Sequence, residues 1–248
     1  MLFRSFMSKI KPEILYHDDD IIIVNKPANF LTIPDRHDAT KPSILNFLKA
    51  QFEPLFIVHR IDKETSGILC FARNEHAHRH LSMQFEHREC EKIYLALVEG
   101  KMMNETGIID KPIAESQTTP GKMVIASRGK SSITKYKVLE YFQNYSLVEC
   151  EIMTGRMHQI RIHLQSIGYP LAIDSMYGRK GEFFLSDVKH KKFRLAKDSE
   201  ERPIMSRSIL HAYRLSINHP TSGERVTFIA ELPKDFDAVV SQIRKWKG

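Results

Sequence analysis

Short runs of apolar residues recur along the chain and are separated by polar turns. Residues 21–27 are almost continuously apolar and end in a proline, a pattern typical of a buried strand. In residues 146–153, apolar residues alternate with glutamates, which indicates a half-buried strand. The same patterns predict strands in residues 55–60, 67–72, 92–100, 123–127 and 133–142, and a hairpin in residues 210–232.

Helical spacing appears at fewer places. Ser43 and Asn74 have side chains that suit helix N-caps, and a helical pattern follows each of them. The apolar face of the second helix consists of Ala77, Leu81 and Phe85. A closing helix is expected in residues 235–246. Because strands dominate and several neighbours look antiparallel, we predict an α+β fold with a mixed, mostly antiparallel β-sheet flanked by helices, in one domain spanning residues 1–248.

A further helix is predicted in residues 157–168, ending at Gly168. Its apolar face consists of Met157, Ile160, Leu164 and Ile167, and its polar stripe of His158, Arg161 and Gln165. Just before it, Thr154 suits an N-cap, and Gly155 lets the backbone approach another group closely. A polar stripe is usually the solvated side of a helix. Arg161, beside the apolar face, is a better candidate than most residues for a buried ion pair with a carboxylate.

The composition is ordinary for a soluble globular protein, with 42% hydrophobic and 27% charged residues among 248. No apolar run approaches the ~20 residues that span a bilayer, and the N-terminus lacks the apolar core of a secretory signal. Three widely spaced cysteines indicate reduced, mostly buried thiols. These features predict a cytoplasmic protein without membrane contact.

The chain is basic, with a formal net charge of +7 and a pI near 9.2. A basic domain of this size favours a polyanionic partner, most often nucleic acid, although solubility alone could account for the charge. Residues 179–207 hold nine Lys or Arg and five Asp or Glu. We interpret this segment as a long basic loop that contacts RNA or another partner, with an inert solvated loop as a nearly equal alternative.

The common cofactor and metal motifs are missing from the sequence. His76 and His80 have the i, i+4 spacing of zinc ligands, but residue 77 is Ala and no third ligand is implied. There is no GxGxxG or Walker loop and no GxSxG elbow. We therefore expect no metal and no cofactor.

The segment VHRIDKETSG, residues 58–67, places Asp62 among cations at the start of an apolar strand. An ordinary explanation is that residues 65–67 form a turn and that Asp62 caps it. The rest of the chain changes this interpretation. Three ordered blocks resemble the RluA family of pseudouridine synthases, namely HRIDKETSGILCFARN (59–74), EKIYLALVEG (91–100) and TGRMHQIRIHLQSIGYPLAIDSMYG (154–178).

The resemblance runs from about residue 14 to residue 235, with two departures. Asn29 stands where the family usually has Gly, and Asn tolerates positive φ. Residues 172–173, Ala and Ile, precede Asp174 where the family usually has a Gly, which concerns a local turn. We also expect no N-terminal S4-type RNA-binding domain.

The resemblance implies a catalytic fold with a central RNA-binding cleft, an isomerisation of uridine to pseudouridine, and no cofactor. Asp62 is then the catalytic carboxylate, Arg161 its ionic partner, and Tyr94 the residue that stacks on the base or removes the C5 proton. Arg60 is expected to fill the gap left by the flipped base. The other RNA contacts are expected from Lys26, His59, Arg156 and His158.

The target stays open between large-subunit ribosomal RNA and transfer RNA, with the uridine in a stem-loop; no DNA binding is expected, and the protein is expected to be a monomer. Two other functions remain as alternatives. One is a non-catalytic RNA-binding protein of the same fold. The other is a hydrolase of an N-glycosidic bond with Asp62 as nucleophile, for which no second carboxylate stands out.

Overall fold

The computed structural model describes residues 11–36, 38, 40–189, 193–194 and 200–246. The chain divides into two compact units. Unit 1 is Met1–Ile93 with His211–Glu231, and unit 2 is Tyr94–Leu210 with Leu232–Gly248. The single domain predicted for the whole chain remains a prediction, and so does its central RNA-binding cleft.

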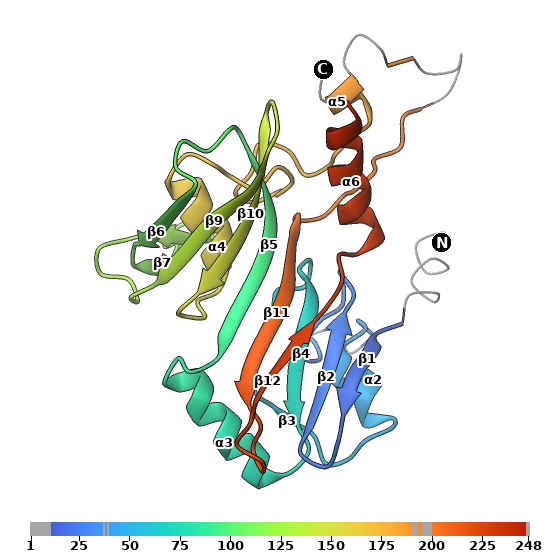
Figure 1. The fold of residues 1–248 in the computed structure, drawn as a ribbon, viewed down its shortest axis with the longest axis vertical. Coiled ribbons are helices and arrows are strands. Elements are labelled where there is room, and N and C mark those ends of the chain that lie inside the picture. The colour runs from blue at the N-terminus through green and yellow to red at the C-terminus, as the bar shows by residue number, and fades with distance from the viewer. Residues whose placement is uncertain (1–10, 37, 39, 190–192, 195–199, 247–248) are drawn as a thin grey trace. The chain divides into compact units, whose positions relative to one another are not determined.

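Unit 1 is built on a sheet of strands far apart in the sequence (Figure 1). Its central strand β4 (Ser66–Ala72) pairs antiparallel with β2 (Ile21–Lys26) and with the short β3 (Phe56–Ile57), and parallel with β11 (Leu210–Asn218). The antiparallel neighbours β1 (Glu13–His17) and β12 (Arg225–Ile229) pair with β2 and β11 respectively. The strands predicted over residues 55–60 and 123–127 are shorter than expected, at Phe56–Ile57 and Met123–Ile125, whereas the others and the 210–232 hairpin are confirmed.

Helices cover both faces of the β2–β4 pair, which explains why these strands are apolar on both sides. Ile22 and Val24 pack on one face against α2 (Ile44–Lys49), and Ile21 and Ile23 pack on the other against α3 (Glu75–Glu86). Both predicted N-caps are confirmed. The Ser43 hydroxyl accepts the amide N–H of Asn46, and the Asn74 side chain accepts that of Ala77.

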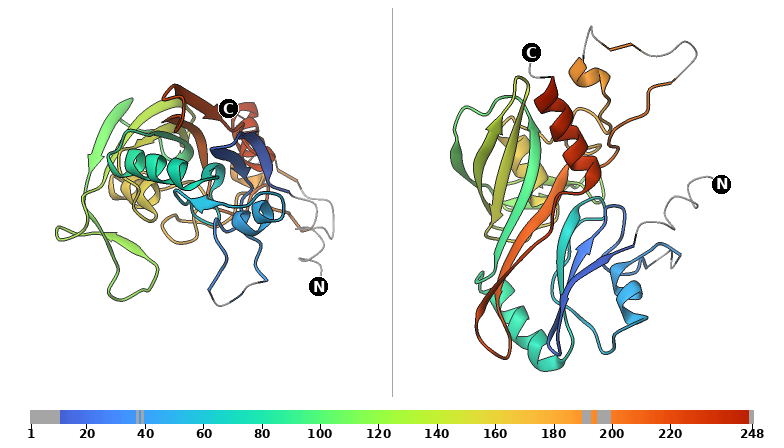
Figure 2. Two further views of the ribbon diagram at one scale, coloured as in Figure 1. Left: turned by 90° about the horizontal axis from the view of Figure 1, so that it is seen from below. Right: turned by 45° about the vertical axis from the view of Figure 1, so that its right-hand side comes forward.

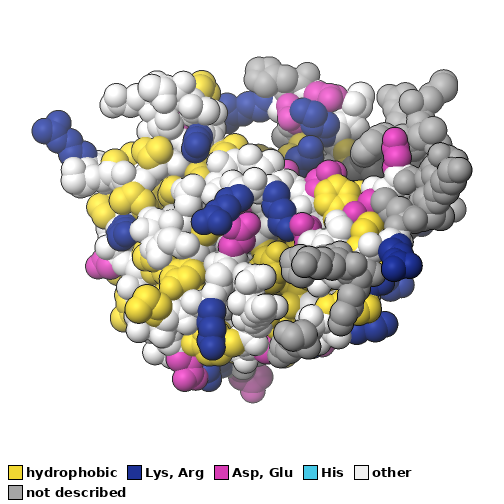
Figure 3. All heavy atoms as spheres, turned by 90° about the horizontal axis from the view of Figure 1, so that it is seen from above, with side chains coloured by type: hydrophobic (Ala, Val, Ile, Leu, Met, Phe, Trp, Pro, Cys, Tyr) yellow, Lys and Arg dark blue, Asp and Glu magenta, His cyan; other side chains and the backbone are white. Residues whose placement is uncertain are grey.

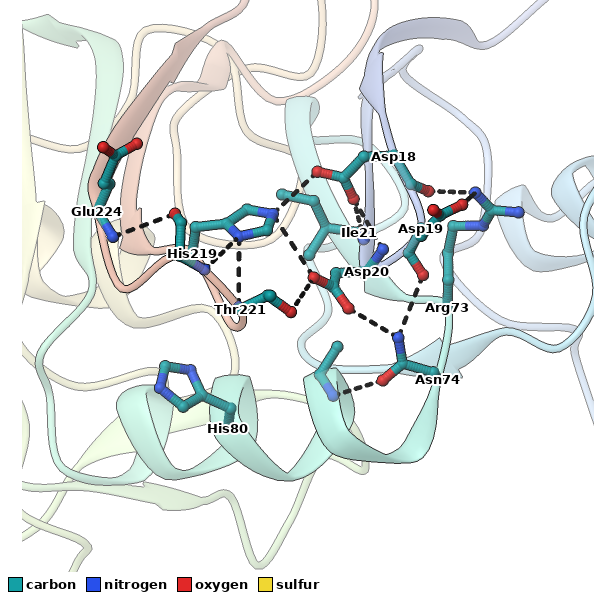
Figure 4. Close-up of polar contacts among 12 residues, drawn as sticks. Asp18, Asp19, Asp20, Ile21, Arg73, Asn74, His80, His219, Thr221 and Glu224 are labelled. Carbon is teal, nitrogen blue, oxygen red and sulfur yellow. Dashed lines mark hydrogen bonds and ion pairs between the residues drawn. The ribbon is translucent and has the colours of Figure 1, made fainter.

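A polar network joins the two hairpin turns of unit 1 (Figure 4). The Nε2 atom of His219, after β11, lies 2.9 Å from the carboxylate of Asp18, after β1. The Thr221 hydroxyl and the Asn74 side-chain amide both donate to Asp20. The helix cap Asn74 therefore also holds the β1–β2 turn in place.

Unit 2 holds most of β5 (Glu91–Glu99), with β10 (Tyr145–Ile152), β9 (Ile133–Tyr141) and β6 (Thr106–Asp110) following in that order across its sheet (Figure 2). The pairs β9–β10 and β6–β9 are antiparallel, as is the separate pair β7 (Ile113–Glu115) and β8 (Met123–Ile125). Its helices are α4 (Gln159–Ser166), α5 (Ser186–Lys189) and α6 (Lys234–Lys245). The closing helix and the alternating strand 146–153 are confirmed.

Two details of the predicted helix at 157–168 are wrong. The helix begins only at Gln159, so Met157 is not on its apolar face and is 44% exposed. Thr154 is not its cap, because the Thr154 hydroxyl accepts the N–H of Ile133 and donates to the side chain of Gln159. The predicted stop at Gly168 is confirmed by its φ of +90°.

The basic segment 179–207 is not wholly a loop. It contains α5 and a bridge between Phe183 and Met205, both of which are buried. Residues 190–192 and 195–199, which carry much of its charge, lie outside the described residues, so its RNA contact remains a prediction. Among the helices of the described residues, none has the length and apolar character needed to cross a bilayer.

Candidate active site

The segment around Asp62 connects β3 to β4 and is held on both sides of the carboxylate. Asp62 itself is half-buried. The Thr32 hydroxyl donates to the Ile61 carbonyl oxygen at 3.1 Å and accepts the Ile61 N–H at 3.4 Å. On the other side, the carbonyl oxygen of Lys63 accepts the Asn29 N–H at 2.8 Å. The two residues that flank Asp62 are thus hydrogen-bonded to the loop that follows β2.

Lys26, at the end of β2, forms a third hydrogen-bonded contact with the Asp62 segment. Its side chain is fully buried, and its Nζ atom donates to the carbonyl oxygens of Pro27, Phe30 and Lys63, at 3.1, 2.8 and 2.9 Å. The ammonium group is directed at these backbone carbonyls inside unit 1, and the predicted contact of Lys26 with RNA remains a prediction. Asn29 has a φ of 66°, so the expectation that it tolerates positive φ is confirmed.

Ser66 and Gly67 begin strand β4 and are not the ordinary turn that the sequence allowed. The Ser66 hydroxyl lies 2.9 Å from Nδ1 of His211, whose Nε2 lies 2.9 Å from the carbonyl oxygen of Ala230. Because the carbonyl can only accept, Nε2 carries a proton, and in the neutral ring Nδ1 then accepts from the Ser66 hydroxyl. A Cβ atom at Gly67 would lie 2.1 Å from the carbonyl oxygen of Ala212, so only glycine fits.

His59 also serves the fold of unit 1. Its Nε2 atom accepts the N–H of Cys70 at 3.0 Å, and its ring stacks on Phe85 with 4.6 Å between centroids. Burial, assisted by the positive charge of Lys92, lowers the pKa of His59 to about 3. This imidazole is therefore neutral near pH 7, and its predicted contact with RNA remains a prediction. The side chain of Arg60, in contrast, is exposed.

Arg161 lies on α4 in unit 2 and forms a buried bidentate ion pair with Asp174. The distances are 2.6 Å from Nε to Oδ2 and 2.8 Å from Nη2 to Oδ1. Arg161 is 5% exposed and Asp174 is fully buried. Burial alone would raise the pKa of Asp174, but the hydrogen bonds and charge of Arg161 outweigh it and lower that pKa.

The expectation of a buried carboxylate partner for Arg161 is thus confirmed, and sequence reasoning missed that Asp174 is one. Asp174 belongs to the block 154–178, in which the sequence indicated only a local turn at this position. That turn forms despite the local departure, since Asp174 accepts the N–H groups of Met176 and Tyr177. The pairing of Arg161 with Asp62 remains a prediction.

The remaining predicted residues of unit 2 lie near α4 or on β5. His158 precedes α4 with a φ of 55°, and its Nδ1 lies 2.9 Å from the hydroxyl of Tyr177. Arg156 donates through Nε to the carbonyl oxygen of Ser131 at 3.2 Å. Tyr94, on β5, is 9% exposed. The predicted residues fall in both units, and their meeting in one site remains a prediction.

Other nucleophiles and metal ligands gain no support within the described part of the chain. There, no group of three or more His, Cys, Asp or Glu side chains could hold a metal ion. All three cysteines are buried, and burial raises the pKa of Cys90 to about 11 and that of Cys150 to about 12. Thiols with such pKa values are poor nucleophiles near pH 7. On the face shown in Figure 3, the described Lys and Arg side chains are dispersed among acidic and apolar ones.

Comparisons with known proteins identify the family. The sequence profile of the RNA pseudouridylate synthase family matches residues 20–166, more than half of the chain. The chain is 36% identical over 243 residues to an RNA pseudouridine synthase of Bacillus subtilis, in a match that covers 94% of this chain and 73% of that protein. It is 37% identical over 237 residues to ribosomal large subunit pseudouridine synthase D of Nitrosomonas europaea, with 94% and 65% covered.

Solved structures agree with this relationship. Human RNA pseudouridylate synthase domain containing 1 is 27% identical, with a TM-score of 0.66 and coverage of 94% of this chain and 95% of that chain. Human RNA pseudouridylate synthase domain containing 4, at 23% identity, shares the fold with a TM-score of 0.73 and coverage of 98% and 95%. These likenesses confirm the predicted α+β fold. The chain therefore belongs to the RNA pseudouridylate synthase family, whose reaction is the isomerisation that the three motifs predicted.

Proposed function

We propose that this protein converts a uridine of structured RNA to pseudouridine with Asp62 as its catalytic carboxylate. The observation that carries the proposal is that hydrogen bonds hold the residues on both sides of Asp62, namely Ile61 and Lys63. A reacting group must be held close to its productive geometry, because small displacements cost large factors in rate. An exposed capping aspartate would need no such support from three separate residues.

The reaction is an isomerisation and needs no redox partner. The bond between C1′ of the ribose and N1 of uracil breaks, the base turns, and C1′ bonds to C5. The proton at C5 is lost and N1 gains one, so that mass and charge are unchanged. Asp62 acts in its ionised form, either by attack on C1′ or on C6, or by removal of the 2′ proton.

Arg161 and Tyr94 complete the proposed site. A guanidinium beside Asp62 would keep its carboxylate ionised in a site that excludes water, where an unpaired charge is costly. The ring of Tyr94 would stack on the uracil, and its hydroxyl would receive the C5 proton. Both assignments rest on the motif blocks that contain these residues and on family membership.

The proposed substrate is large-subunit ribosomal RNA, because this is the RNA named for the relative from Nitrosomonas europaea. Transfer RNA is the second candidate. The target uridine would lie in a stem-loop and would leave its stack to react, at a cost of a few kcal/mol. Arg60, which is exposed beside Asp62, would fill the gap. A monomer acting in the cytoplasm is part of the same proposal.

Product analysis tests the proposal directly. Purified protein is incubated with transcripts of large-subunit ribosomal RNA and with transfer RNA, and the products are examined by carbodiimide mapping and nucleoside mass spectrometry. We expect one or a few carbodiimide-reactive uridines of unchanged mass, formed equally well with EDTA. Release of free uracil would indicate a hydrolase, and binding without any product would indicate a non-catalytic RNA-binding protein.

A further inference from the structure

We propose that Asp174 is a positioning residue for the reaction, which fixes the guanidinium of Arg161 in the orientation that the catalytic site uses. The inference rests on the proposed function, since it is there that Arg161 acts on the catalytic carboxylate. It assigns to Asp174 a part in turnover beyond the turn that it forms between α4 and α5.

The Arg161–Asp174 pair is bidentate, and its geometry fixes the guanidinium. The Asp174 carboxylate accepts hydrogen bonds from both Nε and Nη2 of Arg161, at 2.6 and 2.8 Å. Two parallel hydrogen bonds fix the plane of a guanidinium as well as its position. They occupy one edge of the group, and the N–H bonds of the other edge keep fixed directions. A single contact would leave Arg161 free to rotate about its terminal bonds.

Asp174 is itself rigidly held by hydrogen bonds. It is fully buried, and its Oδ1 atom accepts the N–H groups of Met176 and Tyr177 at 2.9 Å each. Its own N–H donates to the carbonyl oxygen of Lys180, and its carbonyl oxygen accepts the N–H of Gly178. The carboxylate therefore has little freedom, and it passes its fixed orientation on to Arg161.

The ring of Tyr177 packs against the face of the Arg161 guanidinium. The Arg161 Cζ atom lies 5.0 Å from the ring centroid. The Tyr177 hydroxyl accepts the N–H of Met123 at 2.7 Å and lies 2.9 Å from Nδ1 of His158. An edge contact with Asp174 and a face contact with Tyr177 leave the guanidinium one orientation, which exceeds what charge neutralisation alone would need.

The chain offers a control in a second bidentate pair of unit 2, which joins a buried guanidinium to a half-buried carboxylate. Arg207 donates through Nε and Nη2 to Asp235 at 2.7 and 2.8 Å, and Asp235 also accepts a backbone N–H, that of Phe236. Asp174→Asn and Asp235→Asn thus each remove one negative charge from a bidentate pair with a buried guanidinium, although Asp174 is the more deeply buried carboxylate. Only the first pair involves a residue of the proposed site.

The test compares both variants with the wild type on the RNA that the wild type modifies. We expect Asp174→Asn to lower kcat by about 100-fold, the effect of a small misplacement of a reacting group. KM should stay within about threefold, because phosphate contacts lie elsewhere. Asp235→Asn, at a half-buried carboxylate, should lower the melting temperature by a smaller amount and leave kcat within about threefold.

In an Arg161→Lys background, Asp174→Asn should cost much less than 100-fold, because its effect acts through Arg161. An Asp174→Asn enzyme with a kcat matching that of Asp235→Asn would overturn the inference, as would an equal loss in the Arg161→Lys background. If Asp174→Asn unfolds, Asp174→Glu keeps the charge but changes its reach; a lower kcat at unchanged KM would support positioning, and an unchanged kcat would overturn it. A wild type that forms no pseudouridine would instead refute the proposed function.

Discussion

The ammonium group of Lys26 donates a 2.9 Å hydrogen bond to the carbonyl oxygen of Lys63, the residue that follows Asp62. The same nitrogen holds the carbonyl oxygens of Pro27 and Phe30. One buried cation therefore joins the loop after β2 to the segment that carries the proposed catalytic carboxylate. The position of Asp62 and the stability of unit 1 depend on the same three bonds.

Lys26→Met should reduce both stability and turnover. The substitution keeps most of the side-chain volume but removes the Lys26 hydrogen bonds; the Lys63 carbonyl oxygen keeps the Asn29 N–H, whereas those of Pro27 and Phe30 lose their donor. We expect the free energy of unfolding to fall by about 2 kcal/mol or more, since each of the two carbonyl oxygens left unsatisfied costs about 1–3 kcal/mol. Urea titration measures this loss, and kcat on RNA should fall with it.

Lys135→Met is the control, because Lys135 forms an exposed ion pair with Glu151 at 3.2 Å. Exposed pairs contribute at most about 1 kcal/mol, so its stability should change little. If Lys26→Met unfolded at the same urea concentration as the wild type, the three hydrogen bonds of Lys26 would not stabilise unit 1.

His59 should make stability depend on pH below neutrality. Its pKa is near 6.5 in an unfolded chain and about 3 in the fold, so the unfolded state binds more protons between these values. Its contribution to stability is intact above pH 6.5, shrinks as the pH falls toward 3, and is gone below that. The slope approaches about 1.4 kcal/mol per pH unit in the middle of this range.

Urea titrations of the wild type and His59→Gln between pH 4 and pH 7 check this slope. Glutamine does not titrate, so His59→Gln should show a shallower dependence on pH, although it is less stable at pH 7. The control His87→Gln removes a solvent-exposed imidazole and should keep the wild-type slope. Equal slopes for wild type and His59→Gln would contradict the burial of a neutral imidazole.

Arg60→Ala should impair the reaction of a structured substrate selectively. If the guanidinium stacks in the gap left by the flipped base, it offsets about 1–3 kcal/mol of the unstacking cost. We expect a loss of about tenfold or more in kcat/KM on a stem-loop and a smaller loss on an unstructured strand. Arg79→Ala removes a similar charge from the exposed face of α3 and should affect both substrates alike. Equal losses from Arg60→Ala on the two substrates would reduce Arg60 to a general phosphate contact.

Local patterns predicted most of the fold because they report local physics. Strand alternation and the two N-caps depend on residues that are close in sequence, and both were recovered. The start of α4 was not predicted correctly. His158 has a positive φ and belongs to a turn that precedes Gln159, and the helical spacing of Met157 gives no sign of that turn. Tertiary context decided that boundary.

The candidate site shows the same division. The motif blocks predicted roles for Asp62 and Arg161, which remain predictions, and the place of Arg161 beside an apolar face indicated the buried carboxylate partner that Asp174 supplies. The sequence could not show that Lys26 is buried, since a lysine at the end of an apolar strand resembles a surface cation. Its three acceptors come from two loops that only the fold brings together. Asp174 was missed as a partner because it lies 13 residues from Arg161 and beyond the end of the helix.

Pseudouridine formation by Asp62→Asn tests the central claim most directly. Asparagine keeps the size of the side chain and caps a turn about as well as aspartate, but it cannot act as a carboxylate. Mapping of the target RNA after incubation with the variant should reveal no pseudouridine above background, while RNA affinity stays within a few-fold of the wild type, because phosphate contacts set that affinity. Near-normal pseudouridine formation by Asp62→Asn would contradict the account.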